Sequence, residues 1–302
     1  MKRIACIFAI TALTFAAGSG AALAQQQVDE TKAAPAGARV TINNLAGSIS
    51  VTGWDRDEVS VTGTLGADVE RLDFTSEGDR VEIDVVLPED LESGWGKQYE
   101  FSSELEIRVP VGASVEAKGV SAGITVQRVR GDLSLESISG DVRVPGESGR
   151  VRAGSISGDV EVGTVTGSLR AESVSGRVNV REVRGNFMVK TVSGDATVTG
   201  RDIREGVFQS VSGTVRFDGA LAPDATLELE SHSGGIDVLL PADISARFDV
   251  STFSGKISNE FGPQAERTSE YAPGWELDFT TGDGDARIYI QAFSANVDIR
   301  RK

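Results

Sequence analysis

Short runs of alternating apolar and polar residues fill the chain, and between residues 131 and 199 the alternation restarts after a glycine every nine residues. An apolar residue stands two and four places after each glycine, with a mostly polar residue between them. This alternation is typical of half-buried β-strands. The glycines are Gly131, Gly140, Gly149, Gly158, Gly167, Gly176, Gly185 and Gly194; a further apolar residue often follows seven places on, at Ile138, Ile156, Val165, Val174, Val183 and Val192.

Every second glycine belongs to a Ser-Gly motif, so a longer repeat of eighteen residues joins 137–141, 155–159, 173–177 and 191–195. Strands that simply ran up and down would not produce this second period. A coil with two nine-residue sides does, because it places residues eighteen apart above one another. We therefore predict an all-β fold: a parallel β-solenoid with about 18 residues per coil and strands about 4.8 Å apart. Glycine is expected to supply a positive φ at the tight corners.

The predicted solenoid covers residues 120–260, because Ser-Gly pairs continue beyond the regular repeats at Ser212, Ser233 and Ser254. The steps between these pairs widen to 19, 21 and 21 residues. Extra residues are expected to form longer loops on an unchanged core. These loops are predicted near 201–206, 220–224 and 240–245.

Alternating segments with less regular spacing flank the solenoid at both ends. Residues 38–119 are predicted to form an N-terminal β region, either an irregular start of the solenoid or a sheet that caps it. Residues 261–302 are predicted to be a C-terminal cap, because a solenoid needs closed ends. The strands expected in this cap are 275–280, 286–291 and 295–300.

The start of the chain has the features of a secretory signal. A basic start and an apolar run lead to Ala22-Leu23-Ala24, which has the small-x-small form of a signal peptidase site. We predict a signal peptide over 1–24 and a flexible leader over 25–37. Cys6, the only cysteine, would leave with the signal. No stable membrane span is predicted after cleavage, and the expected location is exported, either periplasmic or extracellular.

Charge narrows the range of partners. The chain has 30 Lys and Arg residues against 45 Asp and Glu residues, a net charge of −15. Loss of Lys2 and Arg3 with the signal would leave 28 basic residues and a net charge of −17. Nucleic acid and anionic lipid both require a basic footprint, so neither is predicted as a partner.

Three sets of residues resemble a bacterial putative-adhesin family whose β-strand-repeat domain has no assigned function. They are the segment 45–54, the strand end Val109-Pro110, and the Ser-Gly-Asp-Val runs at 139–142 and 157–160. The likeness extends over most of the chain after the signal. It implies the repeat fold and an exported location, and it brings no catalytic residue with it.

Candidate chemistry in the sequence is sparse. His232 is the only histidine, and it lies between two serines in a turn-like segment, which favours a turn residue over a Ser–His–acid site. Asp141, Asp159 and Asp195 share one predicted column, and stacked carboxylates can bind Ca²⁺. Arg177 interrupts that column, so turn aspartates that bond to their own backbone are favoured. Asp283 and Asp285 around Gly284 present the same choice, with a hairpin turn favoured. No cofactor is predicted.

The sequence therefore predicts an exported, non-enzymatic β-repeat protein that serves as an adhesin-like binding or scaffolding module of the bacterial envelope. Its expected partner is an envelope protein or a glycan. The alternative is a carbohydrate-active enzyme or lectin that uses acidic residues on one face of the solenoid.

Overall fold

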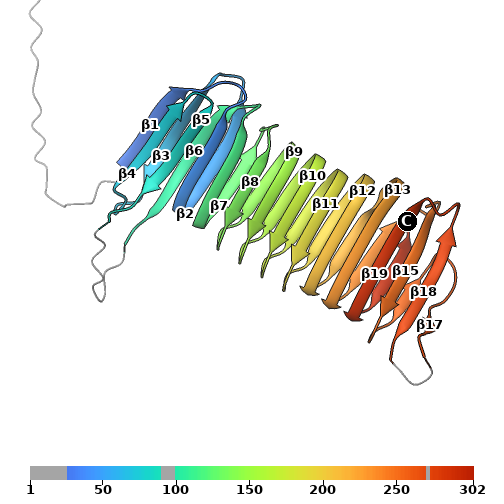
Figure 1. The fold of residues 1–302 in the computed structure, drawn as a ribbon. Coiled ribbons are helices and arrows are strands. Elements are labelled where there is room, and N and C mark those ends of the chain that lie inside the picture. The colour runs from blue at the N-terminus through green and yellow to red at the C-terminus, as the bar shows by residue number, and fades with distance from the viewer. Residues whose placement is uncertain (1–25, 90–98, 270–272) are drawn as a thin grey trace, which may run out of the picture.

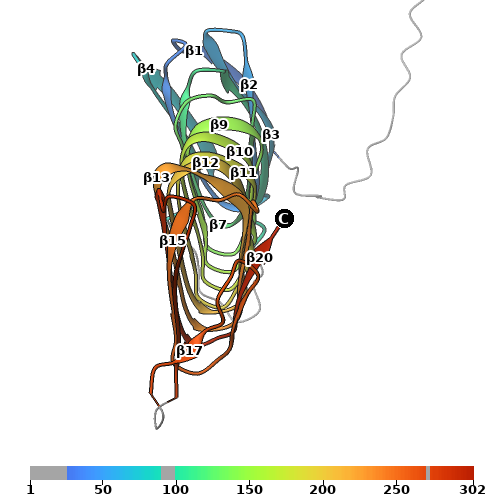
Figure 2. The ribbon, with the colours of Figure 1, turned by 90° about the vertical axis from the view of Figure 1, so that its right-hand side faces the viewer.

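The computed structural model describes residues 26–89, 99–269 and 273–302, and every helix or strand element in these ranges is a β-strand. The strands wind into one long solenoid (Figure 1), whose end view shows two faces joined by tight corners (Figure 2). The prediction of an all-β fold is confirmed. The predicted signal peptide, 1–24, lies outside the described residues. Within them, no helix is long and apolar enough to cross a membrane.

The central coils have the predicted eighteen-residue period. Val142 lies opposite Val160, and Val160 lies opposite Val178, in parallel pairings. Within one strand, Val160 and Val162 point inward on one side of the coil and Leu169 does so on the other. The inward residues of successive coils therefore form continuous apolar columns. The central strands are β8 (Leu133–Ser137), β9 (Val142–Ser155), β10 (Val160–Ser173), β11 (Val178–Thr191), β12 (Ala196–Ser212) and β13 (Val215–Ser233).

A buried serine explains the Ser-Gly motif. The Ser155 hydroxyl donates to the Gly140 carbonyl of the preceding coil at 3.0 Å and accepts from the Gly158 amide at 2.9 Å. Ser173 repeats both bonds one coil further on, with Gly158 and Gly176. A buried polar group is stable only when its hydrogen bonds are made. Ser137 makes the same two bonds one coil earlier, so three successive corners share the pattern. Thr191 instead donates to Ser210, and the buried Ser231 hydroxyl has no hydrogen-bond partner within the described residues.

The corner glycines are required for a different reason from the one predicted. Gly140, Gly158, Gly176 and Gly194 all lie outside the positive-φ region, so the expected left-handed conformation is wrong for them. A Cβ atom built on Gly158 would lie 2.2 Å from the Gly140 carbonyl oxygen of the preceding coil. The corners of neighbouring coils approach too closely for any side chain. Close backbone approach, rather than a positive φ, is therefore the reason that these positions require glycine.

The wider coils absorb their extra residues where the sequence predicts. The pairing of β11 with β12 shifts by one residue between Gly200 and Glu205, so that Thr191 lies opposite Ser210. The pairing of β12 with β13 gains further residues before Thr226, which lies opposite Glu205. These positions match the loops predicted near 201–206 and 220–224. The third predicted loop, near 240–245, follows the last residue of β14.

The C-terminal end differs from the predicted cap. β19 pairs in parallel with both β13 and β15, and β20 pairs in parallel with both β14 and β16. The last coil of the chain, formed by β19 and β20, therefore lies between the coil that ends in β14 and the coil of β15 and β16. Only β18 and β17 close this end, in antiparallel pairings with β15 and with each other. The strands are β14 (Ile236–Leu240), β15 (Ala246–Thr252), β16 (Ile257–Asn259), β17 (Glu266–Arg267), β18 (Trp275–Thr281), β19 (Ala286–Ser294) and β20 (Val297–Arg301).

The N-terminal β region combines the two predicted alternatives. β2 is a full coil that pairs in parallel with β7 on one side and with β5 and β6 on the other. β3 and β4 then pair antiparallel to β6 and β5, and so cap the end. The strands are β1 (Gln26–Ala33), β2 (Arg39–Trp54), β3 (Glu58–Leu65), β4 (Arg71–Glu77), β5 (Arg80–Val86), β6 (Ser102–Pro110) and β7 (Ser114–Gln127).

The predicted flexible leader, 25–37, is wrong for most of its length. β1 pairs antiparallel with β3 along all eight of its residues, from Gln26 opposite Leu65 to Ala33 opposite Glu58. Its side chains are largely polar, and Val28 is its one buried side chain. Backbone hydrogen bonds to an otherwise open edge hold this strand, and such bonds depend little on side-chain type.

Candidate functional site

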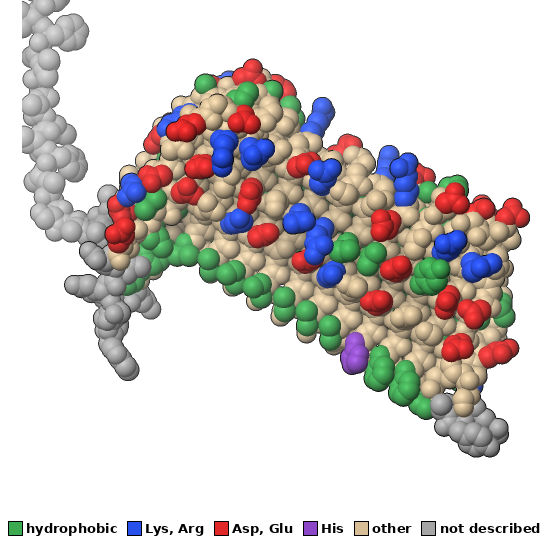
Figure 3. All heavy atoms as spheres, in the orientation of Figure 1, with side chains coloured by type: hydrophobic (Ala, Val, Ile, Leu, Met, Phe, Trp, Pro, Cys, Tyr) green, Lys and Arg blue, Asp and Glu red, His purple; other side chains and the backbone are tan. Residues whose placement is uncertain are grey.

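One exposed side chain, apolar in every coil but that of His232, projects from each successive coil at the serine corner, and together these residues form what we call the apolar ridge. Its aliphatic and phenyl side chains are 40–50% exposed. Eight steps of about 4.8 Å give the ridge a length of about 38 Å. Figure 3 shows it as a row along one edge of the molecule, with the single histidine near one end. In spatial order the ridge consists of Val120, Ile138, Ile156, Val174, Val192, Val211, His232, Phe293 and Phe253.

Backbone bonds between corners hold the ridge residues in one column. The Ile156 amide donates to the Ser137 carbonyl at 3.3 Å, and the Ser157 amide donates to the Ile138 carbonyl at 2.9 Å. The residue after the buried serine therefore faces solvent in every coil. The sequence pattern grouped Ile138 and Ile156 with Val165, but Val165 lies on the opposite corner and is buried. The serine that follows the residue is the signal that separates the two sets, because Val165 is followed by Thr166 instead.

The ridge becomes aromatic at its C-terminal end. The rings of His232 and Phe293 stack with centroids 4.9 Å apart, and those of Phe293 and Phe253 stack at the same distance. The interplanar angles are 2° and 6°. Phe293 lies between the other two because its strand is inserted between their coils. His232 is thus part of a packed surface stack near the end of β13, so its prediction as a turn residue is wrong.

A groove with a volume of about 1420 Å³ runs beside the ridge. Its wall carries charged side chains from the strand segments that precede each serine corner. Charge is distributed unevenly along it: cations lie in the coils from β7 to β11, whereas the coils from β13 to β18 contribute only carboxylates and His232. The charged residues of the lining are Lys118, Glu136, Arg152, Arg170, Glu172, Lys190, Glu230 and Glu276.

Several of these groove charges already have partners within the chain. Lys118 forms an ion pair with Glu116 at 2.6 Å, and the hydrogen bond that Lys118 donates to this carboxylate is the main cause that raises the pKa of Lys118. Arg170 forms an ion pair with Glu172 at 2.5 Å. Arg152 and Lys190 have no ion-pair partner among the residues described, and neither do the carboxylates near the C-terminal end of the groove.

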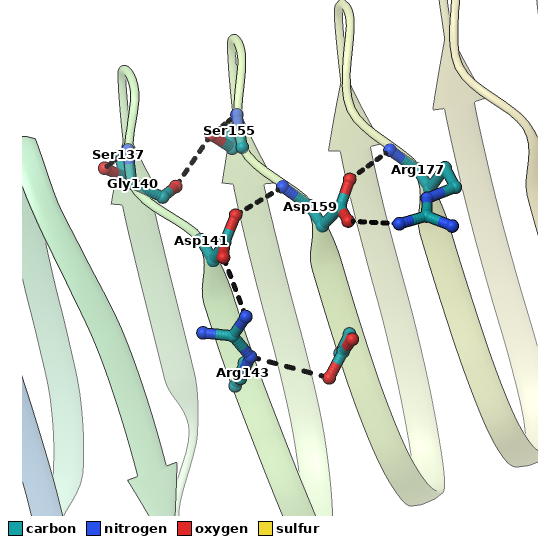
Figure 4. A network of polar contacts seen from close by, with 9 residues as sticks. Ser137, Gly140, Asp141, Arg143, Ser155, Asp159 and Arg177 are labelled. Carbon is teal, nitrogen blue, oxygen red and sulfur yellow. Dashed lines mark hydrogen bonds and ion pairs between the residues drawn. The ribbon is translucent and has the colours of Figure 1, made fainter.

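The first three calcium candidates bridge neighbouring coils. Asp141 accepts from the Asp159 amide at 2.9 Å, and Asp159 accepts from the Arg177 amide at 2.8 Å (Figure 4). Asp195 accepts from the Thr214 amide at 2.7 Å. One oxygen of each carboxylate is therefore used in a structural bond. Arg143 also contacts Asp141, at 2.7 Å.

The remaining two candidates, Asp283 and Asp285, lie in the turn between β18 and β19. Their amides donate to the Ser245 hydroxyl at 2.9 Å and 3.4 Å, and Gly282 and Gly284 in this turn have positive φ. No group of three or more His, Cys, Asp or Glu side chains suited to a metal ion occurs within 26–89, 99–269 and 273–302. All five aspartates thus take part in structural hydrogen bonds, the first three through their carboxylates to the next coil rather than to their own backbone. Calcium remains the untested alternative for them.

Substitution of Asp159 tests the coil-bridging bond. The hydrogen bond from the Arg177 amide is the main cause that lowers the pKa of Asp159, and the Arg177 side chain adds to it at 3.1 Å. Because the pKa of Asp159 is lower in the folded state than in the unfolded state, its ionised carboxylate stabilises the fold at neutral pH. This stabilisation is lost progressively as the pH falls below about 4. We expect Asp159→Ala to lower the free energy of unfolding by about 1 kcal/mol at neutral pH. Urea unfolding at pH 7 and pH 3 measures it, and the difference from wild type should shrink at pH 3.

Asp159→Asn is the matched control for that experiment, because it removes the charge but keeps an oxygen that accepts from the Arg177 amide. At neutral pH, Asp159→Asn should keep most of the stability that Asp159→Ala loses. An Asp159→Ala protein with wild-type stability at both pH values would contradict the assigned role.

Fold and surface together define a β-solenoid protein that is closed at both ends and carries an exposed apolar ridge along one edge. The chain belongs to the Toastrack DUF4097 family, whose model matches residues 38–300. This confirms the resemblance to a β-repeat family without an assigned function. No curated protein matches the chain by sequence.

Three solved structures resemble this chain. A "putative adhesin" from Bacteroides fragilis is 10% identical, with a TM-score of 0.43, and the match covers 91% of this chain and 98% of that one. A "putative adhesin" from Parabacteroides distasonis has the same four values. A "putative lipid binding protein" from Parabacteroides distasonis is 11% identical, with a TM-score of 0.38 and coverage of 91% and 97%.

Proposed function

We propose that this protein is a non-enzymatic binding or scaffolding module, exported to the bacterial envelope, that holds its partner along the apolar ridge. One observation carries the proposal. Among the described residues, every exposed large hydrophobic side chain except Tyr289 belongs to the ridge. Contiguous exposed apolar surface marks an interaction site in an otherwise polar protein. The ridge concentrates that surface on one straight edge of a rigid rod.

The chemistry of the ridge supports binding over catalysis. Aliphatic and phenyl side chains neither transfer protons nor act as nucleophiles. His232 is the one ionisable ridge residue, and its ring is stacked on Phe293 with no hydrogen bond to it among the described residues. A general base needs a partner that orients it, as in the Ser–His–acid arrangement. The proposed export rests on the signal-like segment at 1–24, and the adhesin-like role rests on the ridge.

The test is photo-crosslinking in cells with a reactive amino acid placed on the ridge at Val174. We expect the crosslinker at Val174 to capture one dominant species, and the same probe at the exposed Arg181, away from the groove and ridge, to capture none. Mass spectrometry of the product identifies the partner. Capture of glycan, with no protein partner, would instead favour the lectin alternative.

A ridge variant tests the same proposal by loss of binding. Ile156→Ser together with Val174→Ser removes two exposed side chains from the centre of the ridge. Surface changes of this kind shift stability by only about 0.5 kcal/mol each. We therefore expect an unchanged fold and at least roughly tenfold less captured partner, since interface centres carry most of the binding energy. Equal capture by the variant and the wild type would contradict the proposal.

A further inference from the structure

We propose that the partner on the apolar ridge is a second copy of this chain, packed antiparallel, with ridge against ridge about a two-fold axis near Val192. The inference rests on the proposed use of the ridge as an interaction surface and names what it binds. A two-fold interface uses the same patch on both copies, so the patch must complement itself when reversed. The ridge and its groove meet this condition in both shape and charge.

Shape complementarity follows from the order of the ridge. It has aliphatic side chains at its N-terminal end, aromatic rings at its C-terminal end, and Val192 at its middle position. In an antiparallel pair, Val120 and Ile138 of one copy face the phenyl rings at the other end of the second copy. Aliphatic side chains then pack against rings in the three outer pairs, whereas Val174 packs against Val211 and Val192 packs against its own equivalent. A parallel pair would instead place ring against ring at one end and leave a gap at the other.

Charge complementarity selects the same orientation. The groove wall from β7 to β11 carries four cations and two carboxylates, whereas the wall from β13 to β18 carries the carboxylates of Glu230 and Glu276 and no Lys or Arg. Antiparallel packing places the cationic half of each groove against the acidic half of the other. Parallel packing places like charges together, which costs binding energy across an interface.

One cross-copy pair can be named from the register. With Val192 on the axis, the coil of Ile156 lies opposite the coil of His232, because each is two coils from the centre. On the groove wall, Arg152 lies four residues before Ile156, and Glu230 lies two residues before His232. Both side chains are exposed, and Arg152 has no ion-pair partner among the described residues of its own chain. Glu230 accepts a hydrogen bond from Gln209 at 3.1 Å and has no cation beside it within the described ranges.

Charge reversal tests this pairing directly. We expect the purified protein to sediment as a dimer, and Arg152→Glu or Glu230→Arg alone to weaken dimerisation at least roughly tenfold by placing like charges together. The double variant with both changes should regain dimerisation, because the pair is restored with reversed signs. Sedimentation velocity over a range of concentrations measures each protein. Arg181→Glu is the control, since this exposed arginine lies outside the groove lining.

The outcomes separate this inference from the function it rests on. A wild-type protein that remains monomeric, or a double variant that dimerises no better than the single ones, overturns the antiparallel dimer. If the ridge probe at Val174 then captures a different envelope component, the proposed function stands without the dimer. If the probe captures neither a second copy nor another component, both fail. Circular dichroism of each variant shows that a loss of dimer is not a loss of fold.

Discussion

Gly194→Ala is expected to lower the free energy of unfolding by about 3 kcal/mol or more. A Cβ atom on Gly194 would lie 1.8 Å from the Gly176 carbonyl oxygen, and this oxygen belongs to the backbone of the preceding coil. A backbone atom cannot rotate away as a flexible side chain can, so two coils must separate. In a solenoid each coil is stabilised by its neighbours, and a separated corner weakens both contacts at once. Urea unfolding followed by circular dichroism measures the loss.

Gly149→Ala is the matched control for this substitution. Gly149 belongs to the same nine-residue series but lies at the other corner, where the nearest atom to an added Cβ is the Arg130 carbonyl oxygen at 3.5 Å. Its φ is outside the positive range, so alanine introduces no backbone strain. We expect a change within about 0.5 kcal/mol, or a small gain from a less flexible unfolded chain. Equal destabilisation by both substitutions would contradict close coil-to-coil approach as the reason for the serine-corner glycines.

Phe208→Ala is expected to lower the free energy of unfolding by about 3–5 kcal/mol. Phe208 is fully buried and packs edge-on against Phe187 with ring centroids 5.1 Å apart, and it lies 6.5 Å from Phe217. These rings come from three adjacent strands, β11, β12 and β13. Removal of the Phe208 ring leaves a cavity that the stiff coils cannot close, because backbone hydrogen bonds fix the spacing between strands. Chemical unfolding monitored by circular dichroism gives the magnitude.

Phe208→Leu provides the comparison that isolates the cavity. Leucine fills more of the space than alanine, so Phe208→Leu should lower the free energy of unfolding clearly less than Phe208→Ala does. Phe293→Ala tests location, because Phe293 is 48% exposed on the ridge and its removal leaves no buried void. It should cost no more than its two ring contacts, about 0.5–1.5 kcal/mol each. A cost for Phe208→Ala as small as that for Phe293→Ala would contradict the core role of the aromatic cluster.

The ridge shows how far the sequence reaches towards a candidate site. The recurring apolar residue was visible in the pattern, yet the same spacing also selects Val165 and Val183, which are buried. Only the serine that follows the residue distinguishes the exposed corner, because Val165 and Val183 are followed by Thr166 and Arg184. The buried hydroxyl bonds between coils that shape this corner are visible only in the folded molecule. The aromatic end of the ridge was not predictable, because Phe293 reaches His232 through a strand that returns from the end of the chain.

Sequence alone determined the fold class, the eighteen-residue coil, the inward columns and the positions of the extra residues near 201–206 and 220–224, although these form register shifts within β12 and β13 rather than loops. These features are local, or repeat from one coil to the next, so the alternation and its period specify them. The tertiary structure decided the order of coils at both ends, the pairing of β1, and the single straight ridge. The reason is that backbone hydrogen bonds join any two coils of similar apolar pattern equally well. An alternating sequence requires that each coil has neighbours, and only the packed molecule determines which coils they are.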